Sequence, residues 1–191
     1  MSDSDHDPIP FSPPSVTEDD IERVVEVLRS RWLSTGPVTH DLEERLAERL
    51  GAPHVVAMSS CTAALEISMR SLRLAPGARV GVPAWTFVAS ASSIVNAGGV
   101  PVLLDVEPDT LNLSPTAVAA AIEDGIQALV VVHFAGAAID ESIFGLAASA
   151  GIPVVEDAAH ALGTTDHRGQ MSGAGTVGAC FSFYATKNLT S

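Results

Sequence analysis

The chain contains one lysine, Lys187, in the segment FSFYATKN close to its end. Every other basic residue, among ten in total, is an arginine. A cofactor held through an aldehyde needs a primary amine to form a Schiff base, and arginine cannot supply one because its guanidinium stays protonated. Desolvation by the aromatic residues just before it favours the neutral amine. Lys187 is therefore a candidate nucleophile, although a genome biased toward arginine codons also leaves a lone lysine by chance.

A run of small residues, SSCTAAL at positions 59–65, leads into a predicted helix. Small side chains let an anion approach the free amides and the positive end of the helix, here at Thr62 and Ala63. The same residue types also serve for capping and packing at many helix starts. The run is thus compatible with a phosphate site or with an ordinary helix cap.

Polar and aromatic residues follow two other predicted strands. Asp157, in VVEDAAH, places a carboxylate where it can pair with a protonated heterocyclic nitrogen, and His160 follows three residues later. The alternative is that Asp157 caps a helix and His160 packs in the core. Trp85, in PAWTF, offers a face for a flat ring, although a single Trp more often serves ordinary packing.

Together these four features describe a pocket for pyridoxal 5'-phosphate. The phosphate would lie on the amides at the helix start, the ring against Trp85, its nitrogen on Asp157 and its aldehyde carbon on Lys187. A carboxylate on the ring nitrogen keeps it protonated, which makes the ring an electron sink. A plain structural α/β domain without a cofactor is the alternative.

The elements that must position these side chains alternate along the chain. β-Branched runs predict strands at 55–58, 79–82, 100–104, 129–133, 154–156 and 178–183. Helical stripes lie between them at 62–72, 88–96, 115–122 and 141–150. This alternation predicts an α/β fold with a mostly parallel sheet and helices on both faces, whose ligands gather beyond the carboxyl ends of the strands.

The first fifty residues predict an arm and two helices. Residues 1–16 are rich in Asp, Ser and Pro and predict an extended arm, so the domain itself is expected over 17–191. Thr17 resembles an N-cap, and the helix after it should end near Trp32. A second helical stripe should stop at Gly51.

Composition excludes several classes of protein. With 47% hydrophobic and 17% charged residues the chain is not generally disordered, and much of its surface is expected to be buried inside or between subunits. A formal charge of -13 makes nucleic acid an unfavourable partner. The acidic start and the short apolar stretches predict neither export nor membrane insertion. Cys61 and Cys180 have no metal-ligand spacing, which predicts reduced thiols in a cytoplasmic protein without a metal site.

Six segments in order carry a family resemblance: STGP, SSCTAAL, PAWTFVAS, VVHFAG, EDAAHALG and FSFYATKN. Over residues 9–191 the chain resembles the nucleotide-sugar aminotransferases of the DegT/DnrJ type, which are fold-type I pyridoxal-phosphate enzymes. The resemblance implies a homodimer that transfers an amino group from an amino acid, with glutamate as the expected donor, to a keto group of a nucleotide-linked sugar.

The resemblance also implies roles for individual residues. Lys187 would form the Schiff base, and Asp157 would bind the pyridine nitrogen. Trp85 would stack on the ring, and His160 occupies a position beside the cofactor. Ser182 would donate to the phosphate together with Thr62 and Ala63. Some relatives with His in place of the lysine are dehydratases, so a lysine at 187 favours transamination.

Length is where the chain departs from this family. Members are about twice as long, so the chain is expected to be the N-terminal half, with an incomplete large domain and no small C-terminal domain. Two alternatives follow: a non-catalytic or split-enzyme fragment, or a relative that acts on a cyclic non-sugar ketone.

Overall fold

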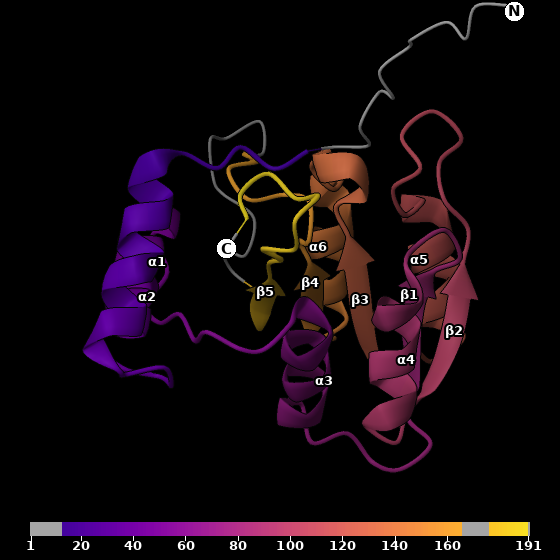
Figure 1. The fold of residues 1–191 in the computed structure, drawn as a ribbon. Coiled ribbons are helices and arrows are strands. Elements are labelled where there is room, and N and C mark those ends of the chain that lie inside the picture. Colours follow the sequence, from indigo (N-terminus) through magenta and orange to yellow (C-terminus); the bar gives the residue numbers. More distant parts are fainter. Residues whose placement is uncertain (1–12, 166–175, 191) are drawn as a thin grey trace, which may run out of the picture.

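The computed structural model describes residues 13–165 and 176–190, which build one twisted sheet between layers of helices (Figure 1). The strands are β1 (Arg79–Pro83), β2 (Val100–Leu104), β3 (Ala128–Val132), β4 (Val154–Asp157) and β5 (Gly178–Cys180). They lie in the order β2-β1-β3-β4-β5, and each neighbouring pair is parallel. The predicted fold class is confirmed.

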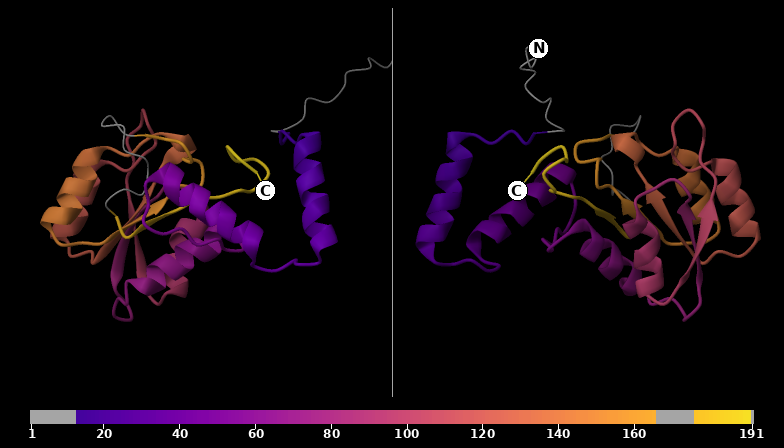
Figure 2. Two further views of the ribbon diagram at one scale, coloured as in Figure 1. Left: turned by 90° about the vertical axis from the view of Figure 1, so that its left-hand side faces the viewer. Right: turned by 45° about the vertical axis from the view of Figure 1, so that its right-hand side comes forward.

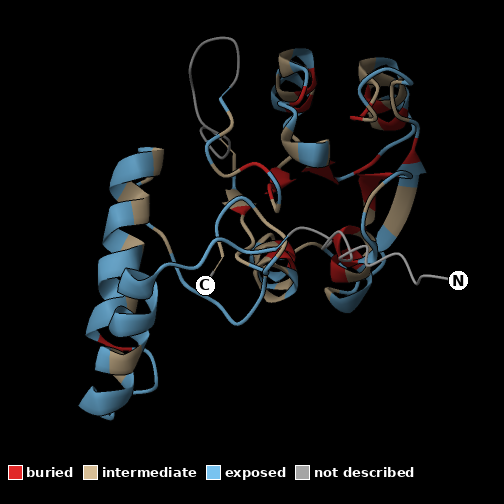
Figure 3. Cartoon of the chain, turned by 45° about the horizontal axis from the view of Figure 1, so that its top comes forward, coloured by how far each residue is buried: buried red, intermediate tan, exposed pale blue. Residues whose placement is uncertain are grey.

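Helices cover both faces of the sheet because successive strand side chains point to opposite sides. Leu129 and Val131 join the core beneath α5 (Pro115–Glu123) and α6 (Glu141–Ser149). Ala128 and Val130 join a second core beneath α3 (Cys61–Ser71) and α4 (Val88–Asn96). Strands buried on both faces read as continuous apolar runs, as β3 does in its sequence ALVVV. Figure 3 shows this buried region at the centre of the sheet.

The strand order places a topological switch between β1 and β3. The chain proceeds from β1 outward to β2 and then returns to the other side of β1, so the connections after β1 and β3 leave in opposite directions. A crevice opens between such connections at the carboxyl ends of the strands. Trp85 follows β1, and the short helix η1 (Phe134–Gly136) follows β3 at this position.

Two N-terminal helices, α1 (Glu18–Ser30) and α2 (Pro37–Leu50), stand apart from the sheet (Figure 2). Thr17 caps α1 in a reciprocal capping box with Asp20, and Gly51 ends α2 in the left-handed conformation. Neither helix contains a buried residue. Residues 13–17 precede α1 without helix or strand, and the rest of the predicted arm, 1–12, lies outside the described residues.

The structure departs from the predicted elements by two residues or more at three places. Residues 55–58 form no strand: Val56 is 66% exposed, and the amide of Ala57 donates to the Glu43 carboxylate instead of to a neighbouring strand. The predicted strand 178–183 stops at Cys180 because its partner β4 ends at Asp157. The first helix ends at Ser30, before Trp32, because Arg31 adopts the left-handed conformation with φ 63°.

Within the described parts of the chain, every helix is too short or too polar to cross a membrane.

Candidate active site

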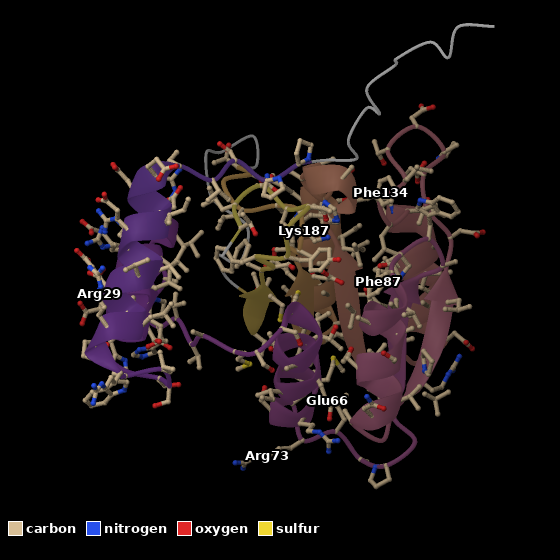
Figure 4. All side chains as sticks on the ribbon, viewed as in Figure 1. Arg29, Glu66, Arg73, Phe87, Phe134 and Lys187 are labelled. Atoms are coloured by element: carbon tan, nitrogen blue, oxygen red, sulfur yellow. The ribbon has the colours of Figure 1, made fainter. Side chains whose placement is uncertain are left out.

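Lys187, labelled in Figure 4, contacts His160 at the carboxyl edge of the sheet. The distance from Lys187 Nζ to His160 Nε2 is 2.6 Å. The lysine lies in a turn after β5, closed by a 2.8 Å hydrogen bond from its amide to the Tyr184 carbonyl. The tertiary structure thus joins two predicted site residues that are 27 positions apart in the sequence.

His160 is a neutral partner for this amine. Desolvation is the main cause that lowers the pKa of His160, and the positive charge of Lys187 lowers it further, while Asp157 acts in the opposite direction. The imidazole is therefore uncharged at neutral pH. Because an ammonium only donates, Nε2 of His160 accepts the hydrogen bond whenever Lys187 is protonated.

Asp157 is the buried carboxylate of the site, with 5% exposure at the end of β4. The Ser90 hydroxyl donates to its Oδ2 at 2.6 Å, and the Ala159 amide donates to its Oδ1 at 3.2 Å. Behind Ser90, the Thr86 hydroxyl lies 2.8 Å away. The carboxylate is thus held by one donor on each oxygen, and each oxygen keeps a further lone pair for another donor.

The start of α3 lies beside the end of β5. Ser60 is the N-cap, and its hydroxyl accepts from the amide of Ala63 at 3.1 Å. The Cys61 thiol donates to the Cys180 carbonyl at 3.3 Å, which ties the helix start to the strand. Thr62 is exposed in this first turn. A helix start of small residues at the site edge fits an anion, although the cap already occupies the Ala63 amide.

The two cysteines nearby are unreactive thiols. Burial is the main cause that raises the pKa of Cys180 to about 11, and burial followed by the negative charge of Asp157 raises the pKa of Cys61 still more strongly. The thiolate is the nucleophilic form, so neither cysteine competes with Lys187 for an aldehyde at neutral pH.

Trp85 and Ser182 complete the predicted set. Trp85 is 55% exposed, and its ring packs against that of Phe134, with centroids 6.3 Å apart and planes inclined by 53°. The two rings join the connections after β1 and β3, where a sheet of this topology is expected to bind its ligand. Ser182 follows β5 by two residues, and its hydroxyl accepts from the Tyr184 amide at 3.3 Å. This is a local turn contact: Ser182 follows β5 at the carboxyl edge of the sheet, and this bond does not link it to α3.

The loop after β3 approaches His160 closely, and a glycine permits this. At Gly136, φ is 85°, and a Cβ would lie 2.8 Å from the His160 carbonyl oxygen. The Thr164 hydroxyl donates to the Gly136 carbonyl at 2.7 Å and fixes the same approach. A side chain at position 136 would therefore displace the segment that carries His160.

Sequence reasoning missed Ser90, Thr86 and a buried pair on the other side of β4. The hydroxyls at 86, 90 and 93 recur at helical spacing in an otherwise apolar segment, and this spacing was the signal in the sequence that could have found them.

The buried pair on the other side of β4 is His133 and Glu156. His133 Nε2 lies 2.7 Å from Glu156 Oε2, and Thr176 donates to Glu156 Oε1 at 2.6 Å. This pair links the ends of β3 and β4, but nothing in the local sequence indicated that the two residues would meet.

A pyridoxal-phosphate-dependent transferase requires a primary amine, an anchored acid, an aromatic face for the ring and a helix start for the phosphate. This parallel α/β domain has all four at the carboxyl edge of its sheet. Residues 14–191 match the DegT/DnrJ/EryC1/StrS aminotransferase family. The chain belongs to this family.

Three relatives illustrate the similarity. The spore coat polysaccharide biosynthesis protein SpsC of Bacillus subtilis (strain 168) is 40% identical over 182 residues, which cover 95% of this chain and 46% of SpsC. Spr1654 from Streptococcus pneumoniae, described as a sugar aminotransferase, is 38% identical in its PLP-form, with a TM-score of 0.88 over 95% of this chain and 50% of Spr1654. DesI, solved in the presence of its TDP-sugar product, is 35% identical, with a TM-score of 0.80 over 92% of this chain and 45% of DesI.

The chain therefore spans about half the length of these relatives. Spr1654 is known in PLP-, PMP- and apo-forms, and pyridoxal phosphate is the cofactor of this family. The residues present fit that cofactor, since the amine and the carboxylate both face the carboxyl edge of one sheet.

Proposed function

We propose that this chain forms the pyridoxal-phosphate-binding part of an aminotransferase that moves an amino group from glutamate to a keto group of a nucleotide-linked sugar. The observation that carries the proposal is the 2.6 Å contact of the only lysine with His160, beside the buried carboxylate of Asp157. Family membership supports the reaction class, and the TDP-sugar product of DesI supports the nucleotide-linked substrate.

The proposed roles follow from position. Lys187 would hold the aldehyde carbon, and Asp157 would bind the ring nitrogen. The start of α3 at Thr62 and Ala63 would bind the phosphate with Ser182, and Trp85 would cover the ring. When bound, pyridoxal phosphate supplies an electron sink for negative charge at the substrate carbon.

Lys187 would have a second role, as the base, whenever its amine is not attached to the cofactor. Its freed amine would take the proton from the substrate carbon at Nζ and return one in the second half of the reaction. His160 is neutral and its Nε2 lies 2.6 Å from Nζ, so it would orient the amine without placing a positive charge beside it. Asp157 is held by Ser90 and Ala159 and stays fixed while the proton moves.

Borohydride reduction tests the cofactor site directly. The purified protein is mixed with pyridoxal phosphate, reduced and mapped by mass spectrometry. We expect the modification at Lys187, because the only competing amine is the N-terminus. The same mixture in denaturant is the control, since there both amines are equally free. Modification of the folded protein at the N-terminus alone, or at neither amine, would contradict the proposal.

We further propose that the enzyme is a cytoplasmic homodimer whose contact surface includes α1 and α2. An apolar stripe on α1, formed by Ile21, Val24 and Leu28, is 45–59% exposed, and Val38 on α2 is 64% exposed. A groove between the helices is lined by Val27 and Trp32 among others. Amphipathic helices that bury nothing in their own chain need a partner to cover their apolar side. The two described thiols are both free, as is usual in the cytoplasm.

Replacing Val24 and Leu28 by glutamine tests this surface. We expect the double variant to raise the dimer dissociation constant at least about tenfold, because it removes two apolar side chains from the interface. Sedimentation velocity over a range of concentrations measures the constant. Glu22→Gln with Glu26→Gln is the control, because it changes the polar side of the same helix. A wild-type monomer at every concentration, or equal constants for both double variants, would contradict the proposal.

A further inference from the structure

The hydroxyl groups of Thr86 and Ser90 form a chain of hydrogen bonds that ends at the Asp157 carboxylate. Ser90 is fully buried on α4, at 0% exposure, and its single hydroxyl proton is donated to Asp157 Oδ2 at 2.6 Å. Because Ser90 has no second proton to give, the 2.8 Å contact with Thr86 must be a donation from Thr86 to Ser90. The chain of hydrogen bonds therefore runs in one direction, from Thr86 through Ser90 to the carboxylate.

This arrangement limits how the carboxylate can turn. The Ala159 amide holds Oδ1 and the Ser90 hydroxyl holds Oδ2, so rotation of the carboxyl group would break at least one of the two bonds. Hydrogen bonds to a charged acceptor are shorter and stronger than neutral ones, and the 2.6 Å distance is in that range. Among the described residues, removal of the Ser90 donor would leave the 5% exposed carboxylate with only the Ala159 amide as a donor.

A neighbouring serine shows that burial alone does not produce this contact. Ser93 lies on the same helix, is 1% exposed and donates its hydroxyl to the Ser90 carbonyl at 2.9 Å. Its bond stays inside α4, whereas that of Ser90 crosses from α4 to β4. Two buried serines one turn apart thus have different roles, one local to the helix and one directed at the site.

We infer that Ser90, supported by Thr86, is a positioning residue that sets the Asp157 carboxylate for the cofactor's ring nitrogen. The inference rests on the proposed function, because it takes from there the role of Asp157. Ser90 acts only through Asp157, so its contribution should depend on the charge of that residue.

A set of four variants tests the inference through cofactor binding. The dissociation constant for pyridoxal phosphate and the absorption spectrum of the bound cofactor are measured for Ser90→Ala, Thr86→Val, Ser93→Ala and Asp157→Asn. We expect Ser90→Ala to weaken binding on the order of tenfold, Thr86→Val about threefold in the same direction, and Ser93→Ala less than about twofold. Thermal unfolding of each variant confirms that the folded protein is being compared.

A double-mutant cycle gives the decisive readout. Added to Asp157→Asn, the Ser90→Ala change should alter the dissociation constant for the cofactor by less than about twofold and leave the absorption spectrum of the bound cofactor the same. The reason is that the charged acceptor of the Ser90 hydroxyl is already gone. An equal effect of Ser90→Ala and Ser93→Ala, or an undiminished effect of Ser90→Ala in the Asp157→Asn background, would overturn the inference. If Asp157→Asn itself leaves both affinity and spectrum unchanged, the role of Asp157 in the proposed function is wrong, and the inference fails with it.

Discussion

Replacing Lys187 with alanine in a complete enzyme is expected to lower turnover by at least about 10⁴-fold, since in the proposed function the only lysine of the chain would serve both as the attachment point and as the base. Turnover is measured with glutamate, pyridoxal phosphate and a nucleotide-linked keto sugar. Small added amines should restore part of the rate in the alanine variant by replacing the missing base.

Lys187→Arg is the matched control for charge. Arginine keeps the positive charge beside His160 but cannot form a Schiff base, so it should be as inactive as alanine and should not be labelled on borohydride reduction at that position. Steady turnover of either variant without added amines would show that Lys187 does not have the proposed role.

Asp157→Asn is expected to leave the cofactor bound while slowing proton abstraction by about 10³-fold, which is about 4 kcal/mol in the barrier. Asparagine has nearly the same shape but no charge to keep the ring nitrogen protonated. A single-turnover experiment with the amino donor, followed by the absorbance of the cofactor, measures the step separately from product release.

Asp124→Asn controls for the loss of a carboxylate. Asp124 forms an ion pair with Arg79, which begins β1 at the opposite, amino edge of the sheet, and its side chain is 70% exposed. The pair is exposed to solvent and lies away from the site, so the rate of the half-reaction should not change. Equal rates in Asp157→Asn and wild type would remove Asp157 from the mechanism.

The local elements were accessible from the sequence because they depend on short-range patterns. The predicted helix 88–96 has the bounds of α4, and the predicted strand 100–104 has those of β2. Thr17 caps α1 as predicted, since a hydroxyl three residues before an acid is sufficient for a capping box. Segment 55–58 shows the limit of such patterns, because β-branched residues become a strand only where another strand lies beside them.

The candidate site also has features that the sequence predicts and contacts that only the tertiary structure reveals. Residue chemistry alone determined the kind of site: a lone primary amine, a carboxylate after a strand and a helix start of small residues, at the carboxyl ends of parallel strands. Only the tertiary structure decided that His160 is the partner of Lys187, and that Ser90 on α4 reaches Asp157 on β4 across 67 positions. Periodicity and capping extend over a few residues, whereas such contacts depend on the order of strands in the sheet, which no local pattern specifies.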